Sequence, residues 1–365
     1  MAGLVAMLCY RANAPATVGS SYIYNFSPKY NAGFLLVTFS ADGNVTVGST
    51  DERNYWVWSK AHGTVKITGL PPGYLIDEGS ITASFDGSVI AGVLGTPWPN
   101  NQGSVPKLFR WTAATGITIL PALPASDIVQ NILMSDDGKS ISFLCTSADG
   151  NPCKGLPFPQ GGEHQELKIW TAGQGYQSVG PDFGNNHNFI EQSPDLKRFL
   201  VGNSYNYWKY VNGHRAGLYI HVDPFALMDA SGKITSFQTP LRDFYPQNIF
   251  TNSELSVVAD KTLMHGPGWN TLVYDSSGAL VATKLPLFCS HFAVSAIDGT
   301  GAIFGEADCL GRMAPTGLRI SGGRAETISH WLKSAGLHYD FPENTVVWKV
   351  SDNGKTIQGY IRQNS

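Results

Sequence analysis

The stretch ILMSDDGKSISF, Ile132–Phe143, decides the fold class of this chain. An apolar segment runs into Ser-x-Asp-Gly, and a second short apolar segment follows. The Asp-Gly pair supplies the positive φ that a tight hairpin turn requires. The stretch therefore predicts two short antiparallel strands joined by a turn.

The same signature recurs along the chain, which makes the hairpin one part of a repeat. Besides Ile132–Phe143, clear copies are LVTFSADGNVTVG (36–48), ITASFDGSVIAG (81–92), SPDLKRFLVG (193–202), AVSAIDGTGAIFG (293–305) and WKVSDNGKTIQG (348–359). A degraded copy, FTNSELSVVAD (250–260), lies where the spacing requires one. Together these stretches indicate seven repeats.

A second signature, an aromatic-rich strand followed by a glycine turn, comes after each of the first six copies. Its examples are YWVWSKAHG (55–63), LFRWTAATG (108–116), LKIWTAGQG (167–175), HVDPFALMDASG (221–232), LVYDSSG (272–278) and LRISGG (318–323). A repeated four-stranded unit of about 45 to 55 residues is the sequence mark of a β-propeller blade. The prediction is an all-β, seven-bladed β-propeller of four-stranded antiparallel blades.

The two ends of the chain are expected to share the last blade. After the seventh turn only one strand remains, whereas Leu4–Arg11 and Ser20–Phe26 are two strand-like segments outside the repeat. Their pairing with the C-terminal strands would close the ring and remove exposed sheet edges. The alternative is that Ala2–Cys9 is the remnant of a leader and the ring closes differently. The predicted single domain, 1–365, has blades at about 34–72, 78–124, 128–181, 187–239, 246–287, 291–338, and 345–365 completed by 3–27.

Composition agrees with many short strands and narrows the range of partners. The chain has 40 glycines and 21 prolines, and only 15% of its residues are charged, against a usual share of about 25%. The net charge is −3 and no Lys/Arg run occurs, which argues against a nucleic-acid partner. No apolar stretch approaches the roughly 20 residues of a transmembrane helix.

The five cysteines contain no C-x-x-C pair, so zinc-thiolate and thioredoxin-type sites are not predicted. Cys145 lies close to Cys153 in the sequence, and Cys289 lies close to Cys309. Two local disulfides would fit an oxidising compartment, and five reduced thiols would fit equally well.

The repeat resembles the TolB-type propeller repeat, and LFRWTAATG is especially similar to the HAF-type repeats of bacterial secreted proteins. The segment Glu326–Gly336, expected to be a short helix, is similar to one found beside such repeats. The resemblance implies a propeller exported to the periplasm or beyond, and it implies no particular chemistry. Because glycine directly follows aspartate in Ser40-Ala-Asp-Gly43, the Asp-box of sialidases is not matched. The Ser and Asp of each copy are expected to bond the backbone of their own turn.

The long, irregular insertions fall on one predicted face, in the loops between second and third strands and between blades. Aromatic rings among Asn, Gln and Gly suit a surface that stacks on sugars and hydrogen-bonds their hydroxyls. The predicted ligand-binding residues are Trp98, Tyr205, Tyr207, Trp208, Tyr245 and Trp269. Packing of these rings against loop bases is the alternative. The leading hypothesis is a module that binds a carbohydrate or cell-surface polymer.

An enzyme is the rival hypothesis, although the Gly-x-Ser-x-Gly, H-E-x-x-H and phosphate-loop motifs are all missing from the sequence. A polysaccharide lyase or hydrolase would need His and Asp side chains converging on the central channel. The weak candidates are His187, His291, His338, Asp127 and Asp243. A lone loop histidine is more often simply solvated, so no metal site and no cofactor are predicted. A protein-protein interaction scaffold is the third hypothesis.

Overall fold

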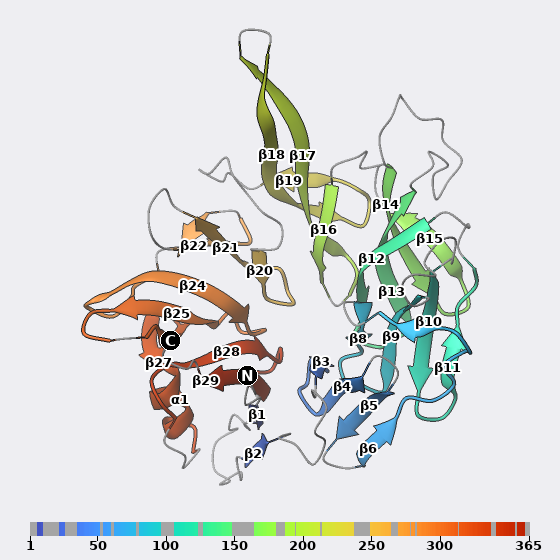
Figure 1. Cartoon of the computed structure of the whole chain (residues 1–365), viewed down its shortest axis with the longest axis horizontal. Helices are drawn as coiled ribbons and strands as arrows, with labels where there is room; N and C mark the ends of the chain where they lie inside the picture. The colour runs from blue at the N-terminus through green and yellow to red at the C-terminus, as the bar shows by residue number, and fades with distance from the viewer. Residues whose placement is uncertain are drawn as a thin grey trace. The chain divides into compact units, whose positions relative to one another are not determined.

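The structure is a computed structural model. It describes residues 6–9, 22–25, 35–51, 54–59, 62–77, 80–95, 106–122, 127–147, 164–179, 187–193, 195–211, 214–236, 249–263, 269–277, 279–281, 283–312, 314–336, 341–354 and 356–361. In this part of the chain the fold is all-β, with seven antiparallel sheets and one short helix (Figure 1). The chain divides into two compact units, which are described separately.

The first unit comprises Met1–Phe34, Ala41–Asn44 and Gln247–Ser365. One of its sheets has the order β20-β21-β22-β23 (Ile249–Thr251, Val257–Leu263, Trp269–Asp275, Leu280–Val281). The next has the order β24-β25-β26-β27 (Cys289–Ile297, Ile303–Cys309, Thr316–Ser321, Arg324–Thr327). Each is a meander in chain order, as the repeat predicts.

Helix α1 (Ile328–Ser334) follows β27 and confirms the short helix expected from the sequence. The Thr327 hydroxyl caps it by accepting a hydrogen bond from the His330 amide at 3.2 Å. Ile328 and Leu332, four residues apart, are both fully buried and face the sheets on one side of the helix.

The third sheet of the first unit draws strands from both ends of the chain. Its order is β2-β1-β29-β28 (Tyr22–Asn25, Ala6–Cys9, Thr356–Ile361, Thr345–Val350). Met7 pairs with Tyr24 on one side and with Gln358 on the other. The expected pairing of N-terminal with C-terminal strands is therefore present. The closed ring of seven blades stays a prediction.

The second unit comprises Leu35–Ser40 and Val45–Pro246 and holds four sheets. Three are meanders: β3-β4-β5-β6 (Leu35–Phe39, Val45–Asp51, Asn54–Ser59, Gly63–Lys66), β12-β13-β14-β15 (Asp127–Met134, Ser140–Ser147, His164–Thr171, Gly175–Val179) and β16-β17-β18-β19 (His187–Gln192, Arg198–Val211, His214–Asp229, Ile234–Ser236). In the fourth, β11-β10-β9 (Gly116–Ile119, Lys107–Thr112, Val89–Gly95), two short strands, β7 (Leu75–Ile76) and β8 (Thr82–Ala83), pair with β9.

The repeated turns are built as the sequence predicts. The Ser135 hydroxyl accepts from the Ser140 amide at 3.0 Å and donates to an Asp137 oxygen at 2.8 Å. That same oxygen accepts from the Lys139 amide at 3.0 Å. The side chains therefore satisfy the backbone groups that the turn leaves open.

In the copy at 293–305, Ser295 and Asp298 do not take the Ser and Asp positions of the turn that the signature predicts. Asp298 takes the serine position, accepting from the amides of Thr300 and Ala302 at 2.9 and 3.0 Å, and Gly301 is the residue with positive φ. Asparagine takes the serine position in the degraded copy, where Asn252 accepts from the Val257 amide.

Turns from consecutive repeats lie side by side within each unit. In the first unit the Gly299 amide donates to the Asp352 carbonyl at 2.8 Å, and the Asn353 side chain donates to the Asp42 carbonyl at 2.7 Å. In the second unit the Phe85 amide donates to the Asp136 carbonyl at 3.0 Å.

Consecutive sheets also share apolar cores. One core joins β9 to β12 and β13, another joins β13 and β14 to β17 and β18, and a third joins β21 and β22 to β24, β25 and β26. Side chains from the facing sheets therefore exclude water between one repeat and the next. This face-to-face packing of successive meanders is typical of propeller blades.

Candidate functional site

Strands β17 and β18 form the longest hairpin in the described part of the chain. Strand β16 pairs with β17 only as far as Asn203, and β19 pairs with β18 only over Ala226–Met228. The hairpin nevertheless continues to the pair Val211 and His214. Figure 1 shows the two strands running on together beyond the other two strands of their sheet. We call this extension, Ser204–Val211 with His214–Phe225, the hairpin arm.

The expectation that Tyr205, Tyr207 and Trp208 lie in an irregular loop is wrong, because they lie in strand β17 and continue its ladder with β18. Tyr207 pairs with Tyr219, and Trp208 pairs with Leu218. Aromatic and branched residues favour extended backbone, and cross-strand aromatic pairs stabilise it. The density of Tyr and Trp that suggested a binding loop is therefore also what makes the segment a strand.

The hairpin arm brings together three of the predicted ligand-binding residues. Tyr205 pairs with His221, two positions along from the Tyr207–Tyr219 pair, so these four residues share one face. Trp208 belongs to the other face with Leu218. The result is a ribbon with an aromatic and histidine face and a mixed face.

The remaining predicted residues are scattered or lie outside the described residues. Trp269 is the first residue of β22, where it pairs with Leu263. His187 begins β16 and Asp127 begins β12. The residues outside the described part of the chain are Trp98, Tyr245, His338 and Asp243.

Among the predicted catalytic residues, only His291 has a described side chain. Its Nδ1 lies 3.4 Å from an Asp308 carboxylate oxygen and 3.3 Å from the Ser290 hydroxyl. A Ser-His-Asp relay needs the serine at one ring nitrogen and the carboxylate at the other. Both contacts here involve Nδ1, so the group lacks the geometry of an activated nucleophile.

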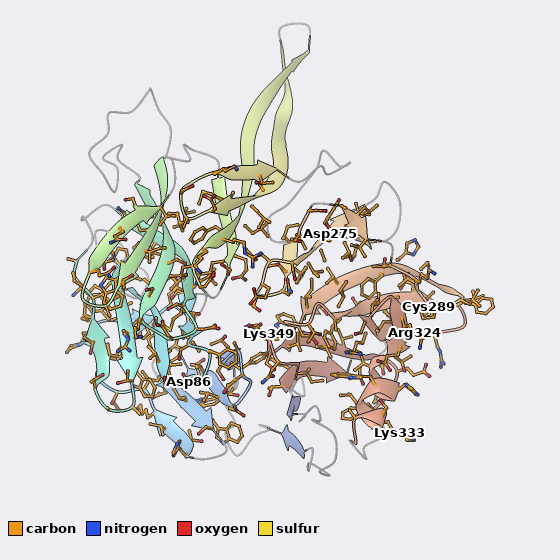
Figure 2. All side chains as sticks on the ribbon, turned by 180° about the vertical axis from the view of Figure 1, so that it is seen from behind. Asp86, Asp275, Cys289, Arg324, Lys333 and Lys349 are labelled. Carbon is orange, nitrogen blue, oxygen red and sulfur yellow. A yellow bond between two sulfur atoms is a disulfide. The ribbon has the colours of Figure 1, made fainter. Side chains whose placement is uncertain are left out.

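This polar group lies beside a disulfide. Cys289 on β24 is directly opposite Cys309 on β25, and their sulfur atoms are bonded, with the Cα atoms 4.0 Å apart (Figure 2). One of the two sequence-local disulfides is therefore present. Cys145 is also disulfide-bonded, and Cys153 lies outside the described residues.

Large apolar side chains are exposed on both sides of the disulfide. Leu287 is 87% exposed, Phe288 74% and Leu310 81%. The Leu310 amide donates to the Phe288 carbonyl at 2.8 Å, so the two residues are cross-strand neighbours. Sequence reasoning missed these three residues. A Leu-Phe pair between Pro286 and Cys289, outside any alternating pattern, was the available signal.

No group of three or more His, Cys, Asp or Glu residues that could hold a metal ion occurs among the described residues. In the same part of the chain, no helix has the length and hydropathy that crossing a membrane requires.

The structure is similar to solved propeller enzymes over its whole length. An oligogalacturonate lyase in complex with manganese matches at a TM-score of 0.56 and 13% identity, covering 100% of this chain and 99% of that one. Oligogalacturonate lyase from Vibrio parahaemolyticus matches at 0.55 and 11%, covering 99% of each chain. TolB from Acinetobacter baumannii matches at 0.43 and 14%, covering 76% of this chain and 62% of that one.

At these identities the likeness shows the fold alone, which is β-propeller-like and all-β. No protein-family model matches the sequence. No curated protein is similar to it either.

Proposed function

We propose that the chain is an exported, seven-bladed β-propeller that binds a carbohydrate or cell-surface polymer through the hairpin arm and the neighbouring loops. The single observation that carries this proposal is the pairing in the arm, which gathers Tyr205, Tyr207 and Tyr219 on one face of a ribbon. Flat rings can stack on the apolar faces of sugars, and His221 on the same face adds hydrogen-bonding capacity.

The proposed ring of blades is supported by the sheets themselves. Seven antiparallel sheets are described, and one is built from both ends of the chain. Sharing of one sheet between the termini ties the first and last strands of a ring together without leaving an open edge. Export is supported by the Cys289–Cys309 disulfide, because such bonds persist in oxidising compartments.

A glycan array tests the binding function, with the wild-type chain compared with Tyr207→Ala and Tyr219→Ala, two residues of the same face. We expect each variant to lose about tenfold in affinity for the glycans that wild type binds, since one stacking ring contributes on the order of 1 to 2 kcal/mol. Val65→Ala is the matched control, because Val65 lies in a strand and is 37% exposed outside the arm. The proposal is contradicted if wild type binds no glycan, or if both variants bind with the affinity of wild type.

A second candidate function is a lyase acting on an acidic polysaccharide. The observation that favours it is the full-length likeness to two oligogalacturonate lyases. Such a reaction needs a base that removes a proton next to the uronate carboxylate, and His187 at the start of β16 is the predicted residue available for that role. Incubating the same preparations with trigalacturonate and following ultraviolet absorbance of an unsaturated product distinguishes turnover from binding.

A further inference from the structure

The ends of β24 and β25 next to the disulfide form a small face with mixed chemistry. Phe288 is opposite Leu310 and Ser290 is opposite Asp308, with the Cys289–Cys309 pair between them. Phe288 and Leu310 lie one residue beyond the disulfide, just outside the two strands, and Ser290 and Asp308 lie one residue inside it. We call Phe288, Ser290, Asp308 and Leu310, with the adjoining His291, the strand-end face.

The backbone holds this face in a conformation that L-residues avoid. Phe288 has a φ of 74° and His291 a φ of 52°, both in the left-handed region. Such a conformation costs on the order of 1 kcal/mol or more per residue and persists only where the surroundings impose it. Packing of the Phe288 side chain offsets little of this cost, because the residue is 74% exposed. Glycine at position 288 would adopt this conformation without strain. Neither the backbone conformation nor packing therefore accounts for an aromatic side chain at Phe288.

Hydrogen-bonding groups lie two residues along each strand from the exposed apolar pair, at Ser290 and Asp308. The His291 Nδ1 contacts both the Ser290 hydroxyl and the Asp308 carboxylate, and Asp308 keeps 60% of its side chain exposed. A carboxylate has two oxygens that can each accept more than one hydrogen bond. The imidazole contact therefore orients Asp308 while leaving it able to accept from a ligand.

We propose that the strand-end face binds one neutral hexopyranose unit of a glycan. The ring of Phe288 stacks on the apolar face of the sugar, Leu310 extends that contact, and the Asp308 carboxylate accepts hydrogen bonds from sugar hydroxyls. A pyranose ring has an apolar face and a rim of hydroxyl groups, which matches the apolar Phe288 and Leu310 and the polar Asp308 of the strand-end face. A neutral sugar is favoured over a uronate because the carboxylate of a uronate would lie close to that of Asp308. The proposal rests on the carbohydrate-binding function and adds a second contact site to it.

The size of the face argues against a protein partner. Phe288 and Leu310, together with the neighbouring exposed Leu287, offer on the order of 400 Å² of apolar surface. A stable protein interface needs about 800 Å² from each partner. One sugar ring is matched by a single aromatic side chain and its neighbours.

Substitutions at Phe288 separate stacking from simple apolar contact. Phe288→Leu keeps an apolar side chain and removes the flat ring, and Phe288→Tyr keeps the ring. The full-length, oxidised protein is titrated with cellotetraose, chitotetraose and trigalacturonate as soluble probes. For the neutral probe that wild type binds, we expect about a tenfold weaker affinity in Phe288→Leu and in Asp308→Ala. We expect a change below about twofold in Phe288→Tyr.

Leu280→Ala is the matched control, because Leu280 is also exposed (58%) and lies on another sheet of the same unit. Its affinity is expected to equal that of wild type. The melting temperatures of all four variants should stay close to wild type, which separates lost binding from lost folding.

The outcomes distinguish this inference from the broader proposal. If wild type binds a neutral probe, and the arm variants Tyr207→Ala and Tyr219→Ala weaken that binding while Phe288→Leu does not, the strand-end face is excluded and the binding function stands. Binding of trigalacturonate alone also overturns the inference. Equal affinity of Phe288→Leu and Phe288→Tyr for the neutral probe contradicts stacking of a sugar on the Phe288 ring and overturns the inference. If wild type binds none of the three probes and no glycan on the array, both the carbohydrate-binding function and the strand-end site are contradicted.

Discussion

At the residue scale, the recurring turn is defined by the hydrogen bonds of two side chains and by one backbone conformation. The fourth turn position has a positive φ in each copy where it is described, and in two copies the residue is Leu196 or Leu255 instead of glycine. Gly43 shows why glycine is otherwise preferred, because a Cβ at that position would overlap the side chain of Thr356. The polar positions tolerate Ser, Asp or Asn, since each offers an oxygen that accepts from the turn amides.

These hydrogen bonds make stability depend on pH. The Lys139 amide and the Ser135 hydroxyl hold the pKa of Asp137 below its ordinary value of 3.8, and the Ser193 hydroxyl does the same for the pKa of Asp195. A carboxyl with a lower pKa in the folded state stabilises the fold above its unfolded pKa. That stability is lost as the pH falls through the folded value. We therefore expect the free energy of unfolding to fall as the pH drops below about 4.

Urea unfolding at a series of pH values measures this dependence. The double variant Asp137→Asn/Asp195→Asn should be less stable at pH 7 and should show a flatter decline below pH 4. An equally steep decline in the double variant would contradict the assignment.

At the element scale, buried hydroxyls connect one sheet to the next. Thr271 on β22 donates to the Phe292 carbonyl and accepts from the Val294 amide, both at 2.9 Å and both on β24. The ladder between β24 and β25 is irregular at this place, between Ser290 and Ala293 and again between Val294 and Ala296. The Thr271 hydroxyl therefore satisfies two backbone groups of β24, the terminal strand of the neighbouring sheet.

Thr271→Val keeps the shape of the side chain and removes both hydrogen bonds. Thr271 is only 9% exposed, so the two backbone groups would be left buried and unsatisfied. The expected loss in free energy of unfolding is about 2 to 4 kcal/mol. Thr271→Ser keeps the hydroxyl and should cost less than half as much. Equal losses for the two variants, by chemical denaturation, would show that packing and not hydrogen bonding is responsible.

At the scale of the whole molecule, the two ends of the chain are joined through one sheet. Strand β1 lies between β2 and β29 and pairs with both. Without β1, the edge of β29 would present unpaired backbone groups and attract other strands. The pairing of β1 with both neighbours therefore gives the N-terminal segment a structural role in this sheet.

Deletion of residues 1–26 tests that role. We expect a melting temperature lower by about 5 °C or more and concentration-dependent self-association, measured by calorimetry and light scattering. A synthetic peptide of residues 1–26 added in trans should restore part of the stability. A truncated chain that stays monomeric and melts with wild type would contradict the structural role of β1 and β2.

Much of the fold could be predicted because its determinants are local. Turn hydrogen bonds act across five residues or fewer, and the strand-turn-strand pattern around Ser135 is complete within a dozen residues. The candidate site could be predicted only in part. The aromatic residues Tyr205, Tyr207 and Trp208 were recognised, but they were expected in a loop and lie in a strand, because Tyr and Trp occur in both binding loops and strands.

The sequence by itself determined the repeat, its turns, the all-β class and the short helix, because each depends on neighbours in the chain. Tertiary structure decided the register of the strands, which places Tyr207 opposite Tyr219, Cys289 opposite Cys309 and Met7 opposite Gln358. It also decided which rings stay exposed, as at Phe288. Register and exposure depend on contacts between segments that are distant along the chain, and no local pattern encodes such contacts.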